Sequence, residues 1–402
     1  MRSSPLPNFH DSLGLACEWL CWHSMIRAEG AAPIIKDGSA YPYQSWTGAL
    51  REYDARTHQW FLFAPLWHTA QAAKAILIAQ QWNALDEFRP AVQTMIDFVM
   101  NGAVRENQAE TEGLLRGHEG DSTWCNTSCA LEALDGLMVY ESLSSDPRAA
   151  KIIDQSLSWI SRKAYLAGKG LFLDNYNPVT GECTSLDWTL RCGHPGRPLL
   201  DGAVFLRQAI RTGDPCYETI FLETAGRLLK EENPPGNWIQ FPPCHAEKGI
   251  IHPRHAYWWG EPMVAAWQRT GDDRFLACAR RAADWYVKAI RLDGGLFRAT
   301  SLDFRTPSFG QEMSGALAAA CLWLSLCEAG KGDEYAESIC LVLRFARELQ
   351  FLTTEDSNLR GAILETIHPP DGTDRPPFAI RDLGTIFYVQ ALSRALHLRL
   401  LS

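Results

Sequence analysis

The chain carries carboxylate side chains in connections rich in glycine, proline and tryptophan, where groups that move protons are often found. Asp121 ends the sequence His118-Glu119-Gly120-Asp121, and Trp124 and Asn126 follow within one turn. A carboxyl group in such a setting can act as a general acid or base; its ordinary alternative is a helix N-cap. We take Asp121 as the first candidate. The full set of carboxylates in comparable positions is Glu119, Asp121, Asp187, Asp201, Glu261, Asp303 and Glu312.

Glu261 and His255 are the two other catalytic candidates. Glu261 follows an aromatic stretch in which an unpaired carboxylate would be costly. We therefore expect either that a buried base such as Arg254 neutralises it or that it faces a cleft. His255 can supply an acid, a base or an anion-binding group. Capping or hydrogen bonding in the core is the alternative for this histidine.

Aromatic and basic residues near the same positions indicate a binding surface. Tryptophan rings stack on flat apolar ligand faces, although for two of Trp67, Trp124, Trp258 and Trp259 we expect a role in the core. Arginines 191, 197 and 254 could hold a carboxylate, with surface ion pairing the alternative for Arg197. The predicted binding residues are Trp67, His68, Glu119, Trp124, Asn126, Arg191, His194, Arg254, Tyr257 and Trp258.

A repeated helical hairpin is predicted to position these residues. The sequences Arg211-Thr212-Gly213-Asp214 and Arg269-Thr270-Gly271-Asp272 are near copies, each between an apolar helix and an amphipathic one. Gly271 can end the first helix in a left-handed cap, and Asp272 or Asp273 can begin the second. The turn aspartates 86, 146, 214, 272 and 333 lie 60, 68, 58 and 61 residues apart. Periods of this size indicate stacked supersecondary units.

The hairpins predict one all-α domain over residues 1–402, arranged as a closed ring. Residues 33–60 are predicted to be an irregular aromatic segment with about one helical turn. The long connections, at 103–120, 164–198, 231–253, 291–308 and 351–380, should gather at one end of the ring and form a binding cleft there. The hairpins cover about residues 61–102, 121–163, 199–230, 254–290 and 309–349, with 381–400 paired with 11–28.

Composition narrows the classes of partner. The net charge of −9 and the lack of a basic run argue against nucleic acid or an anionic membrane as the main partner. The first twenty residues do not resemble a signal peptide, because His10, Asp11 and Glu18 interrupt the apolar run. We therefore expect a cytoplasmic protein with reduced, buried cysteines. Phosphate-loop and dinucleotide motifs are absent and the Cys/His spacings match no standard zinc site, so we expect neither cofactor nor metal. The oligomeric state is left open.

The hairpins resemble the six-hairpin glycosidase superfamily, whose fold is an (α/α)6 toroid. The nearest likeness is to unsaturated glucuronyl and rhamnogalacturonyl hydrolases. Arg254-His255-Ala256-Tyr257-Trp258 with its Thr270-Gly271-Asp272 turn is similar to their Arg-Gly-Gln-Ala-Trp helix and turn, but lacks its glycine and glutamine. Asp121 stands where that family has an aspartate, whereas residues 61–70 hold no counterpart of its second aspartate. The resemblance implies hydrolysis of a small carbohydrate, including uronate-containing oligosaccharides, by carboxyl groups.

Two other chemistries on the same type of fold remain open. N-acylglucosamine 2-epimerase-like enzymes resemble the chain in placing histidines where inner helices start, which would give roles to His255 and to His194 or His368. Polysaccharide lyases would use Tyr257 or His255 as a base and Asn126 or an arginine to neutralise a uronate. A scaffold without catalytic activity is the remaining alternative, because fold does not determine function.

Overall fold

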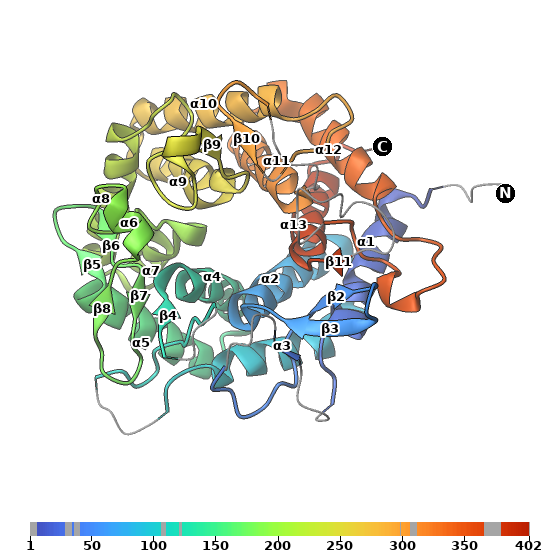
Figure 1. Ribbon diagram of the computed structural model, residues 1–402, viewed down its shortest axis with the longest axis horizontal. Helices are drawn as coiled ribbons and strands as arrows, with labels where there is room; N and C mark the ends of the chain where they lie inside the picture. The colour runs from blue at the N-terminus through green and yellow to red at the C-terminus, as the bar shows by residue number, and fades with distance from the viewer. Residues whose placement is uncertain are drawn as a thin grey trace.

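The computed structural model describes residues 6–28, 34–35, 41–105, 110–119, 123–297, 299–305, 312–365 and 379–401. Its helices form two concentric rings around a common axis (Figure 1). The inner helices are α2 (Pro65–Asn83), α4 (Thr127–Ser144), α7 (Val204–Thr212), α9 (Glu261–Thr270), α11 (Met313–Glu328) and α13 (Leu383–His397). The outer helices are α3 (Arg89–Asn101), α5 (Pro147–Lys163), α8 (Pro215–Lys230), α10 (Asp273–Ala289), α12 (Ala336–Glu348) and α1 (Phe9–Glu18).

Burial explains why inner and outer helices differ in sequence. Helix α11 is buried on nearly every side, as expected for a helix enclosed by neighbours. Helix α10 buries one face, which includes Phe275, Ala282 and Tyr286, and turns its charged residues outward. The apolar inner helix and the one-faced outer helix predicted from the sequence are both present.

The turns within the hairpins follow from short-range chemistry. Gly271 adopts the left-handed conformation at the end of α9, with φ 71°, and its N–H bonds the carbonyl of Trp267. The Asp272 carboxylate then accepts the N–H of Arg274 and begins α10. The glycine cap and the aspartate cap predicted at this turn are confirmed.

The chain closes the ring by packing α1 against α13. The Ser12 hydroxyl donates to Gln350 Oε1 at 2.6 Å and lies 2.7 Å from Tyr388 Oη. Gln350 also donates its amide to the carbonyls of Ser12 and Gly361, each at 3.0 Å. These buried contacts join the first outer helix, the segment after α12 and the last inner helix.

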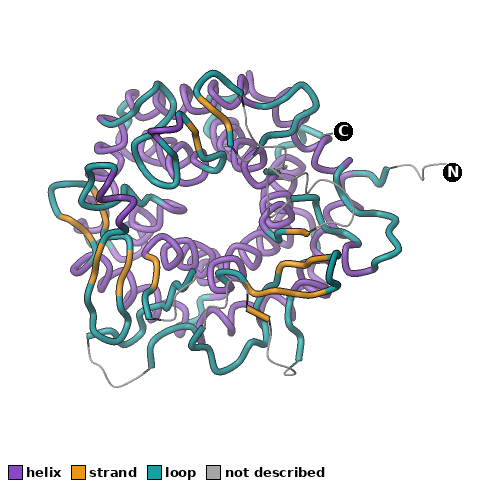
Figure 2. Tube along the Cα trace, in the orientation of Figure 1, coloured by secondary structure: helices purple, strands orange, loops and turns teal. Residues whose placement is uncertain are grey.

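Short strands and long loops gather at one end of the ring (Figure 2). The largest sheet has the order β1-β3-β2-β11, and three smaller sheets accompany it. The strands are β1 (Ile34–Ile35), β2 (Glu52–Asp54), β3 (Gln59–Leu62), β4 (Cys125–Asn126), β5 (Tyr165–Leu166), β6 (Leu171–Phe172), β7 (Asn175–Tyr176), β8 (Cys183–Thr184), β9 (Ile250–Ile251), β10 (Thr300–Ser301) and β11 (Ala379–Ile380).

Residues 41–51 are irregular, as expected for part of the segment 33–60, but the expectation of a helical turn in that segment was wrong. The described residues of the segment contribute three strands and no helix. Strand β2 pairs antiparallel with β3 and, on its other edge, with β11. The strands are only two to four residues long, so alternation was too brief to be recognised in the sequence.

Two inner helices begin irregularly, and both irregularities face the loop-bearing end. The turn Asp201–Ala203 precedes α7, with Gly202 at φ 55° and Ala203 at φ 50°. A single π-helical turn, Ala256–Gly260, precedes α9. Such turns are frequent at functional sites. Among the described residues, no helix is long and apolar enough to span a membrane.

Candidate active site

A cavity of about 270 Å³ opens among the loops at the starts of the inner helices. Helix α4, the turn before α7, the turn before α9 and the connection after β8 all contribute to it. Its walls combine aromatic rings with charged groups of both signs. The lining residues that bear on its chemistry are Trp67, Glu119, Asn126, Ser128, Glu132, Trp188, Arg197, Asp201, His252, Arg254, Trp258 and Trp259.

A pair of carboxyl groups forms one wall of the cavity. Glu132 projects from α4 and Asp201 from the turn before α7, and both are nearly fully buried. The Ser128 hydroxyl lies 3.4 Å from Glu132 Oε1 and 3.3 Å from Asp201 Oδ1, so it bridges the two groups. The Trp258 indole N–H reaches Glu132 Oε1 at 3.3 Å. Two acids held this close in a dry environment cannot both ionise easily.

Burial and mutual repulsion favour the protonated forms of this pair. Burial raises the pKa of Asp201 to about 7, although Arg197 and Ser128 oppose the change. Burial, and then the neighbouring Asp201, raise the pKa of Glu132 well above its usual range. A carboxylic acid that keeps its proton near neutral pH can donate it to a substrate.

Two groups that face the cavity, a carboxyl oxygen and an indole nitrogen, each lack a hydrogen-bond partner within the described part of the chain. They are Asp201 Oδ2 and the indole nitrogen Trp67 Nε1, and both are buried. Leaving such groups unpaired in a protein interior is costly, and native structures rarely do so without a reason. A bound polar ligand would supply the missing partners.

Cations and aromatic rings complete the wall. The Arg254 guanidinium lies 5.4 Å from the ring of Trp258 and 5.9 Å from that of Trp67, within the range of cation–π attraction. Arg197 forms a buried ion pair with Asp174 next to the cavity. The rings provide flat apolar faces, and Arg254 provides positive charge beside them.

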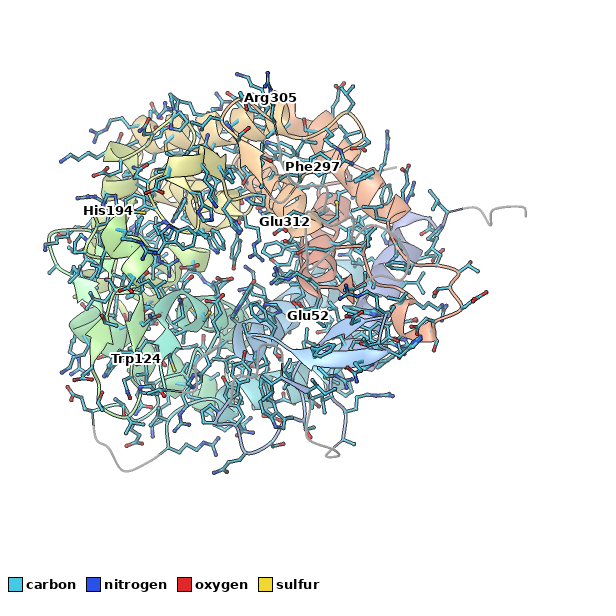
Figure 3. The ribbon with its side chains drawn as sticks, in the orientation of Figure 1. Glu52, Trp124, His194, Phe297, Arg305 and Glu312 are labelled. Atoms are coloured by element: carbon cyan, nitrogen blue, oxygen red, sulfur yellow. The ribbon has the colours of Figure 1, made fainter. Side chains whose placement is uncertain are left out.

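A second acidic cluster lies across the ring, between the starts of α11 and α13. Ser314 donates its N–H to Glu365 at 2.5 Å, and its hydroxyl lies 3.0 Å from Glu365 and 3.5 Å from Glu312. Burial, and then the charge of Glu312, raise the pKa of Glu365 to about 7. Glu312 lies near the centre of the ring in Figure 3. Arg381, which is ion-paired with Glu52 at 3.1 Å, opposes this rise in the pKa of Glu365 through its positive charge.

The residues nearest to a metal-binding arrangement are Glu52, His68 and Asp382. Their candidate ligand atoms all lie within 4.8 Å of one another in the described structure. However, His68 Nδ1 lies 2.6 Å from Asp382 Oδ1, and Glu52 is bound to Arg381. These pairings account for the buried charges without an ion. We therefore assign no metal to them.

The structure brings half of the predicted binding residues together. Trp67, Glu119, Asn126, Arg254 and Trp258 line the cavity. The other five do not line it. His68 is buried behind Trp67, and the Tyr257 hydroxyl points to Asp135. Trp124 and His194 lie toward the outside of the ring (Figure 3), and Arg191 is exposed at the end of the short helix α6 (Asp187–Arg191).

None of the three predicted catalytic residues is among the described residues that line the cavity. Asp121 lies outside the described residues, as does His368. Glu261 Oε1 accepts from Ser325 at 2.6 Å and from Arg394 at 2.9 Å, so a buried base satisfies it, although that base is neither Arg254 nor His255. His255 is fully buried, and each of its ring nitrogens faces a backbone carbonyl, of His252 and of Gly236. Burial lowers the pKa of His255 to about 4.

The two members of the carboxyl pair differ in how visible they are in the sequence. Asp201 is among the seven candidate acids of the sequence, whereas Glu132 is not. A signal was present in Asp201-Gly202, since glycine after an acid at a helix start permits a sharp turn. For Glu132 the signal was a carboxylate within the apolar stretch of α4. Asp187 and Asp303, also among the seven, are exposed.

Comparison with known proteins identifies the architecture. No model of a known protein family matches the chain, and no curated protein matches it. Solved structures do. An unsaturated glucuronyl hydrolase specific for heparin is 12% identical, with 97% of each chain covered and a TM-score of 0.68. A D-mannose isomerase is 12% identical, with 98% of this chain and all of that chain covered and a TM-score of 0.64.

A third neighbour is cellobiose 2-epimerase from Spirochaeta thermophila, 12% identical over 83% of this chain and 86% of that chain, with a TM-score of 0.58. The chain is an (α/α)6 toroid. The prediction of an all-α (α/α)6 toroid closed by its N-terminal helix is thereby confirmed. Because the neighbours of this toroid include hydrolases, an isomerase and an epimerase, the fold leaves the reaction open.

Proposed function

We propose that this toroid is a carbohydrate-active hydrolase that cleaves a small oligosaccharide by carboxyl acid/base catalysis. The observation that carries the proposal is the Glu132–Asp201 pair, in which two buried acids share one cavity wall and Asp201 keeps an oxygen that has no partner among the described residues. Glycoside hydrolysis requires one carboxylic acid that donates a proton and a second group that activates water or attacks carbon.

Asp201 is assigned as the proton donor in this proposal. Its pKa of about 7 keeps a substantial protonated fraction at neutral pH, and its Oδ2 has no other partner in the described structure. Among the described residues, Glu119 is the cavity-lining carboxyl group left as the second group, because the raised pKa of Glu132 disfavours the ionised form that a base or nucleophile needs. Asp121, our first candidate from the sequence, follows Glu119 by two residues and stays a candidate that mutation can test.

The proposed substrate carries a uronate. Arg254 offers its positive charge between two tryptophan rings, an arrangement that suits a carboxylate attached to a flat sugar face. Trp67 Nε1 offers an unused donor beside it within the described structure. Several neighbours of similar fold are named as unsaturated glucuronyl hydrolases, which adds an unsaturated terminal uronate to the substrates worth testing.

The test is incubation of the purified protein with a panel of small neutral, uronate-containing and unsaturated uronate-terminated oligosaccharides. Products are followed by mass spectrometry and by loss or gain of ultraviolet absorbance. We expect cleavage with the gain of one water. Asp201→Asn should lower kcat by about 100-fold or more, because it removes a positioned acid. Asp187→Asn, the same change at an exposed acid in α6, should leave kcat unchanged.

Other outcomes assign other reactions. A new unsaturated product would identify a lyase, and a product of unchanged mass would identify an isomerase or epimerase; either result contradicts the hydrolase. The epimerase alternative relied on paired histidines. Within the described residues, His252 is the one histidine that lines the cavity, whereas His255 is in the core and His194 is outside. This arrangement favours acid/base catalysis by carboxyl groups over catalysis by a pair of histidines.

A further inference from the structure

Asp135 is a buried carboxylate that lies beneath the active-site cavity and not in it. It projects from α4 one turn after Glu132, and its side chain is almost fully covered. Oδ2 accepts from Lys74 at 2.7 Å, from Gln71 at 2.9 Å and from the hydroxyl of Tyr257 at 3.0 Å. These contacts join helices α2 and α4 to the turn before α9.

The other oxygen of Asp135 is tied to the turn that carries Asp201. Arg207 Nη1 donates to Asp135 Oδ1 at 2.5 Å and to the carbonyl of Gly202 at 3.4 Å. Gly202 itself presses on Asp135, because a Cβ added to it would lie 2.3 Å from Asp135 Cγ. The residue that follows Asp201 is therefore held against Asp135 by both a hydrogen-bonded bridge and direct packing.

Asp135 is charged under neutral conditions. Burial alone would raise its pKa, but Lys74 and Arg207 outweigh burial, so the pKa of Asp135 lies well below its usual range. Its negative charge acts on Asp201 from below and favours the protonated form of that acid. The other charged groups around Asp201 are Glu132, Glu119, Arg197 and Arg254 at the cavity and Lys74 and Arg207 beneath it.

We propose that Asp135 is the positioning residue of the active site: it fixes the Asp201–Gly202 turn through Arg207 and packing, and it places a negative charge behind the catalytic acid. The inference rests on the proposed function for its catalytic consequence. It assigns to the Lys74–Asp135–Arg207 network a role beyond joining helices α2 and α4 to the turns before α7 and α9. Neither Asp135 nor Lys74 lines the cavity, so neither touches the substrate.

Two substitutions should move the proton affinity of Asp201 in opposite directions. Asp135→Asn removes the negative charge and leaves two cations nearby, so the pKa of Asp201 should fall. Lys74→Met leaves Asp135 less neutralised, so the pKa of Asp201 should rise. We expect each to shift the alkaline midpoint of kcat/KM by about half a pH unit or more, the scale of nearby buried charges. A purely structural role would lower kcat without moving this midpoint.

Glu328→Gln is the matched control. Glu328 lines a separate cavity of about 310 Å³ beneath the active site, together with Lys74 and Asp135, but it is bound to Arg394 at 2.8 Å. Removing its charge should leave the midpoint where it is in the wild type. An equal shift in this variant would mean that any charge beneath the ring acts on Asp201, which overturns the specific role of Asp135.

A second readout separates this inference from the proposed function. The folded-state pKa of Asp201 is raised from 3.8 to about 7, so its contribution to stability is complete below 3.8 and is lost as pH rises through about 7. The difference in Tm between wild type and Asp201→Asn, measured against pH, therefore reports this pKa without substrate. Its midpoint should move down with Asp135→Asn and up with Lys74→Met.

Together the two measurements distinguish the role of Asp135 from the hydrolase activity. A shifted midpoint in the pH dependence of the Tm difference, with no detectable hydrolysis, would support the positioning role of Asp135 and contradict the hydrolase activity. Hydrolysis with unchanged midpoints in both variants would contradict the positioning role of Asp135 and still agree with the proposed hydrolase activity. If Asp135→Asn fails to fold, the midpoint shift of Lys74→Met tests the inference by itself, because this variant keeps Asp135, Arg207 and the packing of Gly202 in place.

Discussion

At the scale of single residues, environment decides which acids can do chemistry. Asp201 and Glu132 share a hydroxyl in a buried wall, whereas Glu261 shares Arg394 with Glu328. The first arrangement raises carboxyl pKa values, and the second supplies a permanent positive charge. The same kind of side chain therefore stands beside a second acid in one place and beside a guanidinium group in the other.

The pH dependence of catalysis should reflect the Glu132–Asp201 pair. The proposed proton donor has a pKa raised to about 7, so kcat/KM should fall as pH rises through about 7 and the acid loses its proton. The measurement is the pH profile of kcat/KM on the best substrate of the panel. A flat profile over roughly one pH unit on either side of neutrality would show that this pair does not supply the proton.

His255 should contribute to stability and not to the chemical step. Replacing it with alanine removes contacts to two backbone carbonyls and to the Tyr286 hydroxyl at 2.9 Å, and should lower the free energy of unfolding by about 2 kcal/mol or more. The folded variant should keep its kcat. Denaturant unfolding and kinetics on the same preparation test this, and a lost kcat with unchanged stability would return His255 to the catalytic candidates.

The neutral form of His255 also predicts a response to acid. Its folded-state pKa is lowered from 6.5 to about 4, so the stability it contributes is present above 6.5 and is lost as pH falls through about 4. The wild-type protein should lose Tm over this window relative to His255→Ala.

At the scale of elements, the hairpins depend on close helix contacts that only particular residues allow. Gly136 in α4 packs on α2 so tightly that an added Cβ would lie 2.2 Å from the carbonyl oxygen of Ala70. Glu132 and Asp135 lie on the same helix, within about one turn of Gly136. Helical glycine is unfavourable by itself, so its presence here reflects packing.

Two glycine substitutions should therefore have opposite signs. Gly136→Ala should destabilise the protein by about 1–3 kcal/mol, because α2 and α4 must separate. Gly226→Ala in α8 meets nothing within 4 Å and should stabilise it by up to about 1 kcal/mol through helix propensity. Chemical denaturation of both variants provides the measurement, and equal effects would contradict the packing explanation.

At the scale of the whole molecule, the ring must be closed between segments far apart in sequence. Ser12, Gln350 and Tyr388 meet in the interior and connect α1, the segment after α12 and α13. None of the three lines the active-site cavity. The contacts that close the ring should therefore contribute to the stability of the toroid and not to its catalytic activity.

Ser12→Ala should weaken closure without affecting catalysis. It leaves buried groups of Gln350 and Tyr388 short of a partner, which should cost about 1–3 kcal/mol of unfolding free energy. Ser142→Ala removes an exposed hydroxyl bonded to Val139 and should change stability by less than about 0.5 kcal/mol. Thermal unfolding compares the two, and kcat/KM should equal the wild-type value in both.

The hairpins and their turns were predictable because they depend on neighbours in sequence. Gly271 and Asp272 determine their turn through local backbone geometry, and the contrast between the enclosed α11 and the one-faced α10 follows from the period of apolar residues. The short strands at residues 34–62 were missed because two to four residues carry too little pattern. Asp201 was noticed as an acid, but its partner Glu132 lies 69 residues earlier and nothing local connects them.

Periodicity, caps and turns are local, so the order of residues was enough to specify a ring of helical hairpins with one loop-rich end. The choice of candidate catalytic acids needed the folded chain. Burial and distance set the pKa of a carboxyl group, and both arise where separate hairpins converge: Asp201 meets Glu132 and Asp135, Glu261 meets Arg394, and His255 meets two carbonyls. The pKa of a carboxyl group is therefore set by its surroundings in the folded chain and not by its residue type alone.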